Sequence, residues 1–129
     1  MSDESQDRLL IEECLNYFFT GLDELDAEIV KQAFHPEARS YSTTPTGLCV
    51  YGVSEWDGFI EQAKQDPEHT FARSRARKTI LMIDITGTAA SAKVRWEFAD
   101  CTYTDYYNLL KLDGRWQIVG EIYHREGRT

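Results

Sequence analysis

The sequence predicts an α+β domain in which three N-terminal helices pack on a strongly curved, mainly antiparallel, barrel-like sheet. Apolar residues recur at helical spacing in the first half of the chain, and long runs of branched and aromatic residues fill the second half. Asp113 and Gly114 separate two of these runs, and an Asp-Gly pair between strand-forming residues is a strong hairpin signal. The helices and the sheet are therefore expected to form two layers.

Length and composition limit the classes of protein to which the chain can belong. Its 129 residues suffice for one domain, which spans residues 1–129. The net charge of −8 opposes binding to nucleic acid, and no apolar run approaches the roughly 20 residues that cross a bilayer. The N-terminus is acidic, unlike a secretory signal, and three widely spaced cysteines are typical of reduced thiols. We expect a cytoplasmic protein with no nucleic-acid or membrane partner.

Capping residues and breakers predict where the three helices begin and end. Asp7 is expected to cap the first helix, which ends near Gly21, and a second helix follows over about 24–34. Ser54 is expected to cap the third helix, which ends near Gln65.

The remaining segments are predicted to be strands. Residues 39–43 and 48–51 form a short pair, and residues 71–85 and 90–98 form two long strands before the hairpin at 103–124. Apolar and polar residues alternate in 90–98, so one face of that strand is buried. The last four strands are consecutive and antiparallel, and strands of this length twist and curl.

The predicted sheet is apolar on both faces. Residues 80–83 are apolar without a break, and adjacent apolar residues recur in the hairpin. Three helices can cover one face, and a bare apolar face is rare. We expect a second copy of the chain to cover the other face, because most oligomers are symmetric homodimers. The curled sheet and its helices then enclose a cone with one open end.

The hairpin turn decides which residues face the interior of this cone. A two-residue turn places Asp105 on the face of His124, whereas a three-residue turn with a bulge places these two side chains on opposite faces. We slightly favour the bulged turn, because it puts Leu110 and Leu112 beside Trp116.

Three segments carry a resemblance to known proteins: AFHPEA at 33–38, IDITGTAASAKV at 83–94 and YTDYYNLLKLDGRWQIVGEIYH at 103–124. They resemble the nuclear transport factor 2-like superfamily, a cone-shaped, cystatin-like α+β fold, and within it the putative lumazine-binding (SnoaL-like) group. The resemblance implies a dimer with an interior pocket. Members of the superfamily include ketosteroid isomerases, polyketide cyclases, scytalone dehydratase and binding domains, so the fold alone does not choose a function.

Candidate catalytic residues are Asp105 and His124. A carboxylate on an apolar cavity wall has a raised pKa and suits proton transfer, and an imidazole titrates near neutral pH. Either side chain can instead be solvated at a strand end. The expected ligand-pocket residues are aromatic or amide-bearing: Tyr17, Trp56, Phe59, Trp96, Tyr106 and Asn108. The histidines lack metal-site spacing and no cofactor motif is present, so neither a metal nor a cofactor is expected.

One stretch departs from the acidic character of the chain. Arg73, Arg75, Arg77 and Lys78 form either a solvated strand end or an anion-binding edge of the cavity.

Three functions are compatible with these patterns. The first is a binding domain that holds a small, partly apolar ligand in an interior aromatic pocket. The second is a cofactor-independent isomerase, dehydratase or cyclase, in which Asp105 or His124 carries the proton and Tyr17 stabilises an oxyanion. The third is a module that binds a partner only through its sheet, in which case side chains fill the cone.

Overall fold

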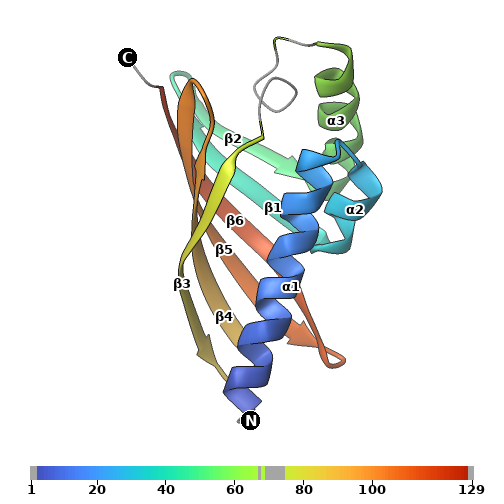
Figure 1. Cartoon of the computed structure of the whole chain (residues 1–129), viewed down its shortest axis with the longest axis vertical. Coiled ribbons are helices and arrows are strands. Elements are labelled where there is room, and N and C mark those ends of the chain that lie inside the picture. The colour runs from blue at the N-terminus through green and yellow to red at the C-terminus, as the bar shows by residue number, and fades with distance from the viewer. Residues whose placement is uncertain (1–2, 67, 69–74, 128–129) are drawn as a thin grey trace.

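A computed structural model describes residues 3–66, 68 and 75–127 (Figure 1). The elements in chain order are α1 (Asp3–Asp23), α2 (Ala27–Gln32), β1 (Phe34–Thr44), β2 (Gly47–Gly52), the 3-10 turn η1 (Val53–Glu55), α3 (Trp56–Gln65), β3 (Arg77–Thr86), β4 (Ala89–Glu97), β5 (Cys101–Leu112) and β6 (Arg115–Gly127). The strand predicted over residues 71–85 begins at Phe71, which lies outside the described residues. Arg73 lies outside them as well.

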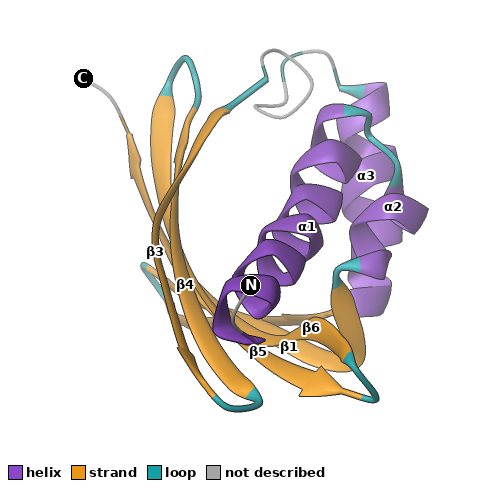
Figure 2. Ribbon diagram, turned by 60° about the horizontal axis from the view of Figure 1, so that its bottom comes forward, coloured by secondary structure: helices purple, strands orange, loops and turns teal. Residues whose placement is uncertain are grey.

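The six strands form one mixed sheet in the order β2-β1-β6-β5-β4-β3. Strands β1 and β6 pair in parallel, and every other neighbouring pair is antiparallel. The sheet is strongly curved but open, and the helices lie on its concave face (Figure 2). The predicted α+β class, the curved sheet and the four consecutive antiparallel strands are confirmed.

The core lies between α1 and the concave face of the sheet. Phe18 of α1 is its centre, with its ring in edge-on contact with Phe34, Trp56 and Trp96 at centroid distances of 5.1, 5.3 and 5.3 Å. Such aromatic pairs contribute about 0.5–1.5 kcal/mol each beyond the area that they bury. The alternation in the segment 90–98 is confirmed, since its apolar side chains are buried under α1.

Asp7 does not cap the first helix, contrary to the prediction. The helix begins at Asp3, and Asp7 is buried inside it. The Trp116 indole Nε1 and the Lys111 Nζ each donate a hydrogen bond to Asp7 Oδ1 at 3.0 Å. A sequence pattern cannot distinguish a capping carboxylate from one that binds donors on a distant strand.

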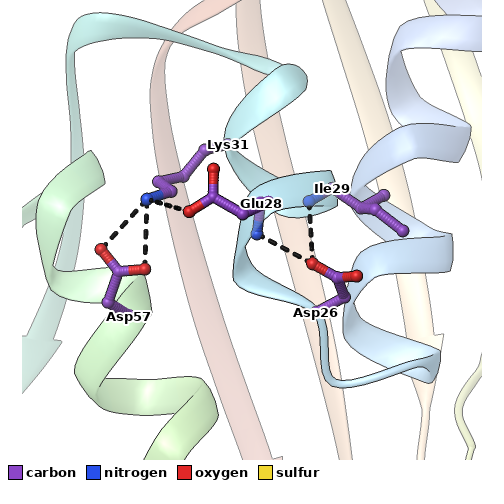
Figure 3. Close-up of polar contacts among 5 residues, drawn as sticks. All are labelled: Asp26, Glu28, Ile29, Lys31 and Asp57. Atoms are coloured by element: carbon purple, nitrogen blue, oxygen red, sulfur yellow. Dashed lines mark hydrogen bonds and ion pairs between the residues drawn. The ribbon is translucent and has the colours of Figure 1, made fainter.

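The second helix is shorter than predicted at both ends. Asp26 is its cap, and its Oδ1 accepts hydrogen bonds from the backbone N–H groups of Glu28 at 3.0 Å and Ile29 at 3.3 Å (Figure 3). Lys31 then ties α2 to α3 by donating to both carboxylate oxygens of Asp57 at 3.1 Å.

The third helix ends at Gln65 as expected but begins differently. Ser54 lies in the preceding 3-10 turn and is not its cap. Instead, the Glu55 side chain accepts a hydrogen bond from the backbone N–H of Gly52 at 2.7 Å.

The favoured bulged turn in the hairpin is wrong. Leu112 pairs with Arg115, and Asp113 and Gly114 adopt φ angles of 50° and 76°, as a two-residue type I′ turn requires. The bulge lies within β6 instead, because Asn108 pairs with Gly120 while the next residue of β5 pairs with Ile118.

The convex face of the sheet carries large apolar side chains that none of the described elements covers. These exposed residues are Tyr41, Leu48, Val50, Leu81, Met82, Tyr106, Leu110, Leu112 and Ile122. In the part of the chain that is described, no helix has both the length and the apolar character needed to cross a membrane.

Candidate ligand site

An aromatic cavity of about 280 Å³ lies between the helices and the concave face of the sheet. Small-molecule sites have volumes of roughly 300–1,000 Å³, so this cavity suits a ligand near the small end of that range. Its lining residues are Phe18, Leu22, Cys49, Tyr51, Trp56, Phe59, Gln62, Trp96, Phe98, Tyr103, Asp105, Glu121 and Tyr123. Side chains therefore do not fill the interior. The hypothesis of a module that binds a partner only through its sheet requires a filled interior, so the cavity argues against it.

Two buried carboxyl groups reach this cavity from adjacent strands. Asp105 points inward because the alternating positions of β5 that include Tyr107 and Leu109 all face the helices. Glu121 points inward because of the bulge in β6. Side chains alternate along a strand, so an inward Ile118 would by itself place Glu121, three residues later, on the outward side. Val119 is the extra residue of the bulge, and it reverses that direction.

Each carboxyl group has one oxygen bonded to a hydroxyl, and its other oxygen is left to the second carboxyl group of the pair. The Tyr107 hydroxyl donates to Asp105 Oδ2 at 2.6 Å, and the Ser40 hydroxyl donates to Glu121 Oε1 at 2.6 Å. Among the described residues, the buried Asp105 Oδ1 and Glu121 Oε2 have no hydrogen-bond partner apart from the neighbouring carboxyl group of the pair. The exposed fractions of Asp105 and Glu121 are 6% and 3%, so bulk water cannot solvate these oxygens well.

Burial and mutual interaction shift the titration of this pair toward neutral pH. Burial raises the pKa of Asp105 to about 7, although hydrogen bonds from Tyr107 and Glu121 oppose the shift. Burial, followed by the charge of Asp105, raises the pKa of Glu121 well above its usual value. The two groups titrate as one pair, which is neutral below pH 7 and holds one proton and one negative charge above it.

Neighbouring tyrosines remain protonated beside this charge. Burial, followed by the charges of Asp105 and Glu121, raises the pKa of Tyr107 well above its usual value. Burial and the charge of Glu121 likewise raise the pKa of Tyr51, whose hydroxyl also interacts with Tyr123. Phenol groups that stay neutral can donate hydrogen bonds to the carboxyl pair or to a ligand.

Four residues predicted for the site line the cavity. They are Asp105, Trp56, Phe59 and Trp96. The aromatic residues of α3 lie there because the helix packs its apolar side against the sheet edge formed by β2, where Tyr51 contacts the Phe59 ring at a centroid distance of 5.0 Å.

The other four predicted residues lie elsewhere. Tyr106 and Asn108 occupy outward positions of β5, and His124 is exposed on the neighbouring part of β6. The two-residue turn and the alternation along β5 direct Tyr106 and Asn108 outward. His124 points away because the bulge in β6 turns it outward, just as the bulge turns Glu121 inward. Tyr17 is 40% exposed on α1 and borders a separate surface depression near Trp116. None of the four can act inside this cavity.

Sequence reasoning missed Glu121 as a site residue. Its polar side chain within an otherwise apolar strand was visible in the sequence, but its direction depends on a bulge that no residue pattern marks. Cys49 and Tyr51 were missed because the short strand that carries them gave no sign of packing against α3.

The described cations of the basic stretch are paired with acids outside the cavity. Arg75 lies 3.6 Å from Glu24, and Lys78 bonds to Asp23. They do not form an anion-binding edge. Among the described residues, no three His, Cys, Asp or Glu side chains cluster closely enough to hold a metal ion.

Comparisons with known proteins agree with this architecture. The family model described as "Putative lumazine-binding" matches residues 6–124. The chain is 22% identical to Aldolase FrzH of Cladobotryum sp over 107 residues, which cover 83% of this chain and 82% of that protein.

Two solved structures share the fold. An NTF2-like protein of unknown function from Shewanella baltica OS155 is 26% identical with a TM-score of 0.78, and the match covers 98% of each chain. A protein of unknown function with a cystatin-like fold from Nostoc punctiforme PCC 73102 is 16% identical with a TM-score of 0.73, covering 94% of this chain and 92% of that one. The chain therefore belongs to the family described as "Putative lumazine-binding", within the NTF2-like superfamily.

Proposed function

We propose that this protein binds a small, partly apolar ligand in the cavity between its helices and its sheet. The observation that carries the proposal is the combination of an aromatic wall with two buried carboxyl groups, each of which has an oxygen that no group outside the pair satisfies. Buried polar atoms are normally hydrogen-bonded, and one proton shared within the pair cannot satisfy both carboxyl groups, so these oxygens favour a ligand with donor groups. The aromatic side chains supply the apolar contact area.

The indole groups provide a direct test of binding in the cavity. Trp56 and Trp96 line it, whereas Trp116 is bonded to Asp7 away from it. A fragment library should contain compounds that shift the indole N–H signals of the first two tryptophans in NMR spectra and leave the third unchanged.

A pair of variants separates cavity binding from surface binding. Cys49→Trp fills the cavity and should abolish the shifts, whereas Thr46→Trp, in the exposed turn between β1 and β2, should retain them. If no fragment shifts Trp56 or Trp96, or if Cys49→Trp binds as well as the original protein, the proposal is wrong.

A second candidate is a cofactor-independent acid–base enzyme, such as an isomerase, dehydratase or cyclase. The raised pKa of Asp105, at about 7, favours it, because a general base works best when its pKa lies near the operating pH. Ionised Asp105 would remove a proton from a carbon next to a ligand carbonyl, and protonated Glu121 would donate a hydrogen bond to the developing enolate. The name of the aldolase relative fits chemistry of this kind.

Hydrogen exchange tests this candidate without knowledge of the substrate. Carbonyl compounds that bind in the cavity are incubated in D2O, and loss of the hydrogen next to the carbonyl is followed by NMR. Asp105→Asn should abolish exchange while leaving the binding of a neutral ligand nearly intact. Exchange at an unchanged rate in this variant would exclude Asp105 as the base.

We further propose that two copies of the chain associate through the convex face of the sheet. Its exposed residues include Ile122 of β6 at 55% and Leu48 of β2 at 69% exposure, and β1 between these two strands contributes the exposed Tyr41. An apolar surface of this extent on a curved sheet favours a second sheet as its cover. The cavity lies on the other side of the sheet, so each copy would keep its own site.

A further inference from the structure

We infer that the cavity selects ligands that carry a protonated amine. This inference deepens the proposed binding function, since it names the class of ligand, and it rests on that function. The site presents a buried carboxyl pair at the base of an aromatic wall, and no basic side chain is among the described residues that line it.

The charge balance of the cavity is the first step of the argument. Above pH 7 the pair of Asp105 and Glu121 holds one negative charge in a site that excludes most water. A buried charge is costly unless it is paired. The hydroxyl groups of Tyr107 and Ser40 each satisfy one carboxyl oxygen, but they supply no positive charge. A cationic ligand would supply it.

Among the residues that the structure describes, no cation lies where it could take this role. Tyr51 on β2 and Tyr123 on β6 also line the cavity, and a phenol group supplies no positive charge. The lining residues that come from α1 and α3 are uncharged. Lys78 lies 5.7 Å from the centroid of the Trp96 ring, but it is paired with Asp23 and does not line the cavity.

Arg125 is a second cation near the cavity wall in the described part of the chain. Its charge acts on Tyr103, where it partly opposes the rise in pKa that burial causes. Arg125 is exposed on β6 and is not a lining residue, so it leaves the carboxyl pair without a partner.

The aromatic wall favours the same ligand class. A cation within about 6 Å of an aromatic face is attracted by the ring quadrupole, and aromatic cages with carboxylates recognise ammonium groups for this reason. Trp56, Phe59 and Tyr51 are in mutual edge-on contact, with centroid distances between 5.0 and 5.9 Å, and they present several rings to the cavity. The net charge of −8 also attracts cations toward the protein.

Matched ligands test the inference by isothermal titration calorimetry. The first probes are 2-phenylethylamine, 2-phenylethanol and 3-phenylpropanoate, which share a phenyl ring and differ in charge. A second set with the larger indole ring consists of tryptamine, tryptophol and indole-3-propanoate. At pH 8 the amines should bind at least about tenfold more tightly than the alcohols, and the acids should bind most weakly.

The pH dependence provides a second readout. Amine affinity should rise about tenfold between pH 6 and pH 8, because the carboxyl pair loses a proton with a pKa of about 7 while the amine stays charged. At pH 6, buffers of different ionisation enthalpy should report release of close to one proton for each amine bound.

Asp105→Asn removes the charge without removing the shape of the site. It should weaken amine binding at pH 8 by about tenfold or more, abolish the pH dependence and leave alcohol binding within about threefold. Asp84→Asn, which removes the same charge from an exposed position of β3, is the matched control and should bind like the original protein.

Different failures identify which proposal is wrong. If the alcohols or acids bind as tightly as the amines, or if Asp105→Asn binds amines normally, the preference for amines is refuted while ligand binding in the cavity stands. If none of the six probes binds at millimolar concentration, both the inference and the proposed binding function are refuted.

Discussion

Asp105 and Glu121 face the same interior cavity for two separate structural reasons. The two-residue turn at Asp113 and Gly114 turns Asp105 inward, and the bulge in β6 turns Glu121 inward. As a result, two carboxyl groups from adjacent strands share one buried environment with no cation beside them among the described lining residues. Such an arrangement decreases stability at neutral pH unless a ligand binds to it.

The pH dependence of stability should show this cost. The folded pKa of Asp105, at about 7, is above its unfolded value near 3.9, so its contribution to stability is full below pH 3.9 and is lost as the pH rises toward 7. Asp105→Asn removes this loss while its amide oxygen can still accept from Tyr107. The difference in free energy of unfolding between the variant and the original protein should therefore shift in favour of the variant by about 2 kcal/mol from pH 5 to pH 8.

Urea denaturation at pH 5 and pH 8 measures that difference. Asp84→Asn serves as the control, because it lies exposed on β3 and should show no such change between the two pH values. If the free energies of unfolding of Asp105→Asn and the original protein differ by the same amount at both pH values, the raised pKa of Asp105 is contradicted.

Asp7 should show the opposite pH dependence. Hydrogen bonds from Trp116 and Lys111 lower its pKa, so its contribution to stability is present above pH 3.9 and is lost as the pH falls through the lower folded value. Asp7→Ala should lower the melting temperature at pH 7 by several degrees, and Asp7→Asn by less, since its amide oxygen can still accept from Trp116. Calorimetric scans at pH 7 and pH 3 test this. An equal decrease at both pH values would show that the charge of Asp7 is unimportant.

Gly21 fixes the approach of α2 to α1. A Cβ at this position would lie 2.5 Å from Val30 Cγ2 and 2.6 Å from the Val30 backbone nitrogen. Because a backbone atom cannot move away easily, Gly21→Ala should destabilise the protein by about 1–3 kcal/mol.

A second glycine provides the matched control for this substitution. Gly58 lies in α3 with open space around its Cβ direction, and Gly58→Ala should stabilise the protein by about 0.5–1 kcal/mol through helix propensity. Denaturant titrations of both variants measure these changes. Similar effects of the two substitutions would mean that contact with Val30 does not limit the packing of the helices.

The proposed association through the sheet can be measured by sedimentation. The original protein should sediment as a dimer of twice 14.9 kDa at micromolar concentration. Ile122→Asp, which places a charge in the centre of the convex face, should give a monomer that still binds ligands in the cavity. A monomeric original protein would refute the association.

The fold was predictable from the sequence because its signals are local. Alternation in 90–98, helical spacing in α1 and the Asp-Gly turn each depend on neighbouring residues. The site was predictable only in part. Asp105 and the aromatic residues of α3 were found, but Tyr106 and His124 were assigned to the wrong side, because a shift of one residue in strand register reverses every side chain.

The role of Asp7 was hidden for a related reason. Its donors, Lys111 and Trp116, are more than a hundred residues away along the chain, and only the packing of α1 across the hairpin brings them together. Local patterns predict elements, whereas buried polar partners depend on how those elements meet.

A crystal structure of the protein purified without added ligand tests the central claim most directly. The electron density should show an open cavity between α3 and the sheet that holds a bound molecule or ordered solvent against Asp105 and Glu121. A cavity closed by rearranged side chains of Trp56 and Phe59, with both carboxyl groups bonded to protein donors, would contradict the account.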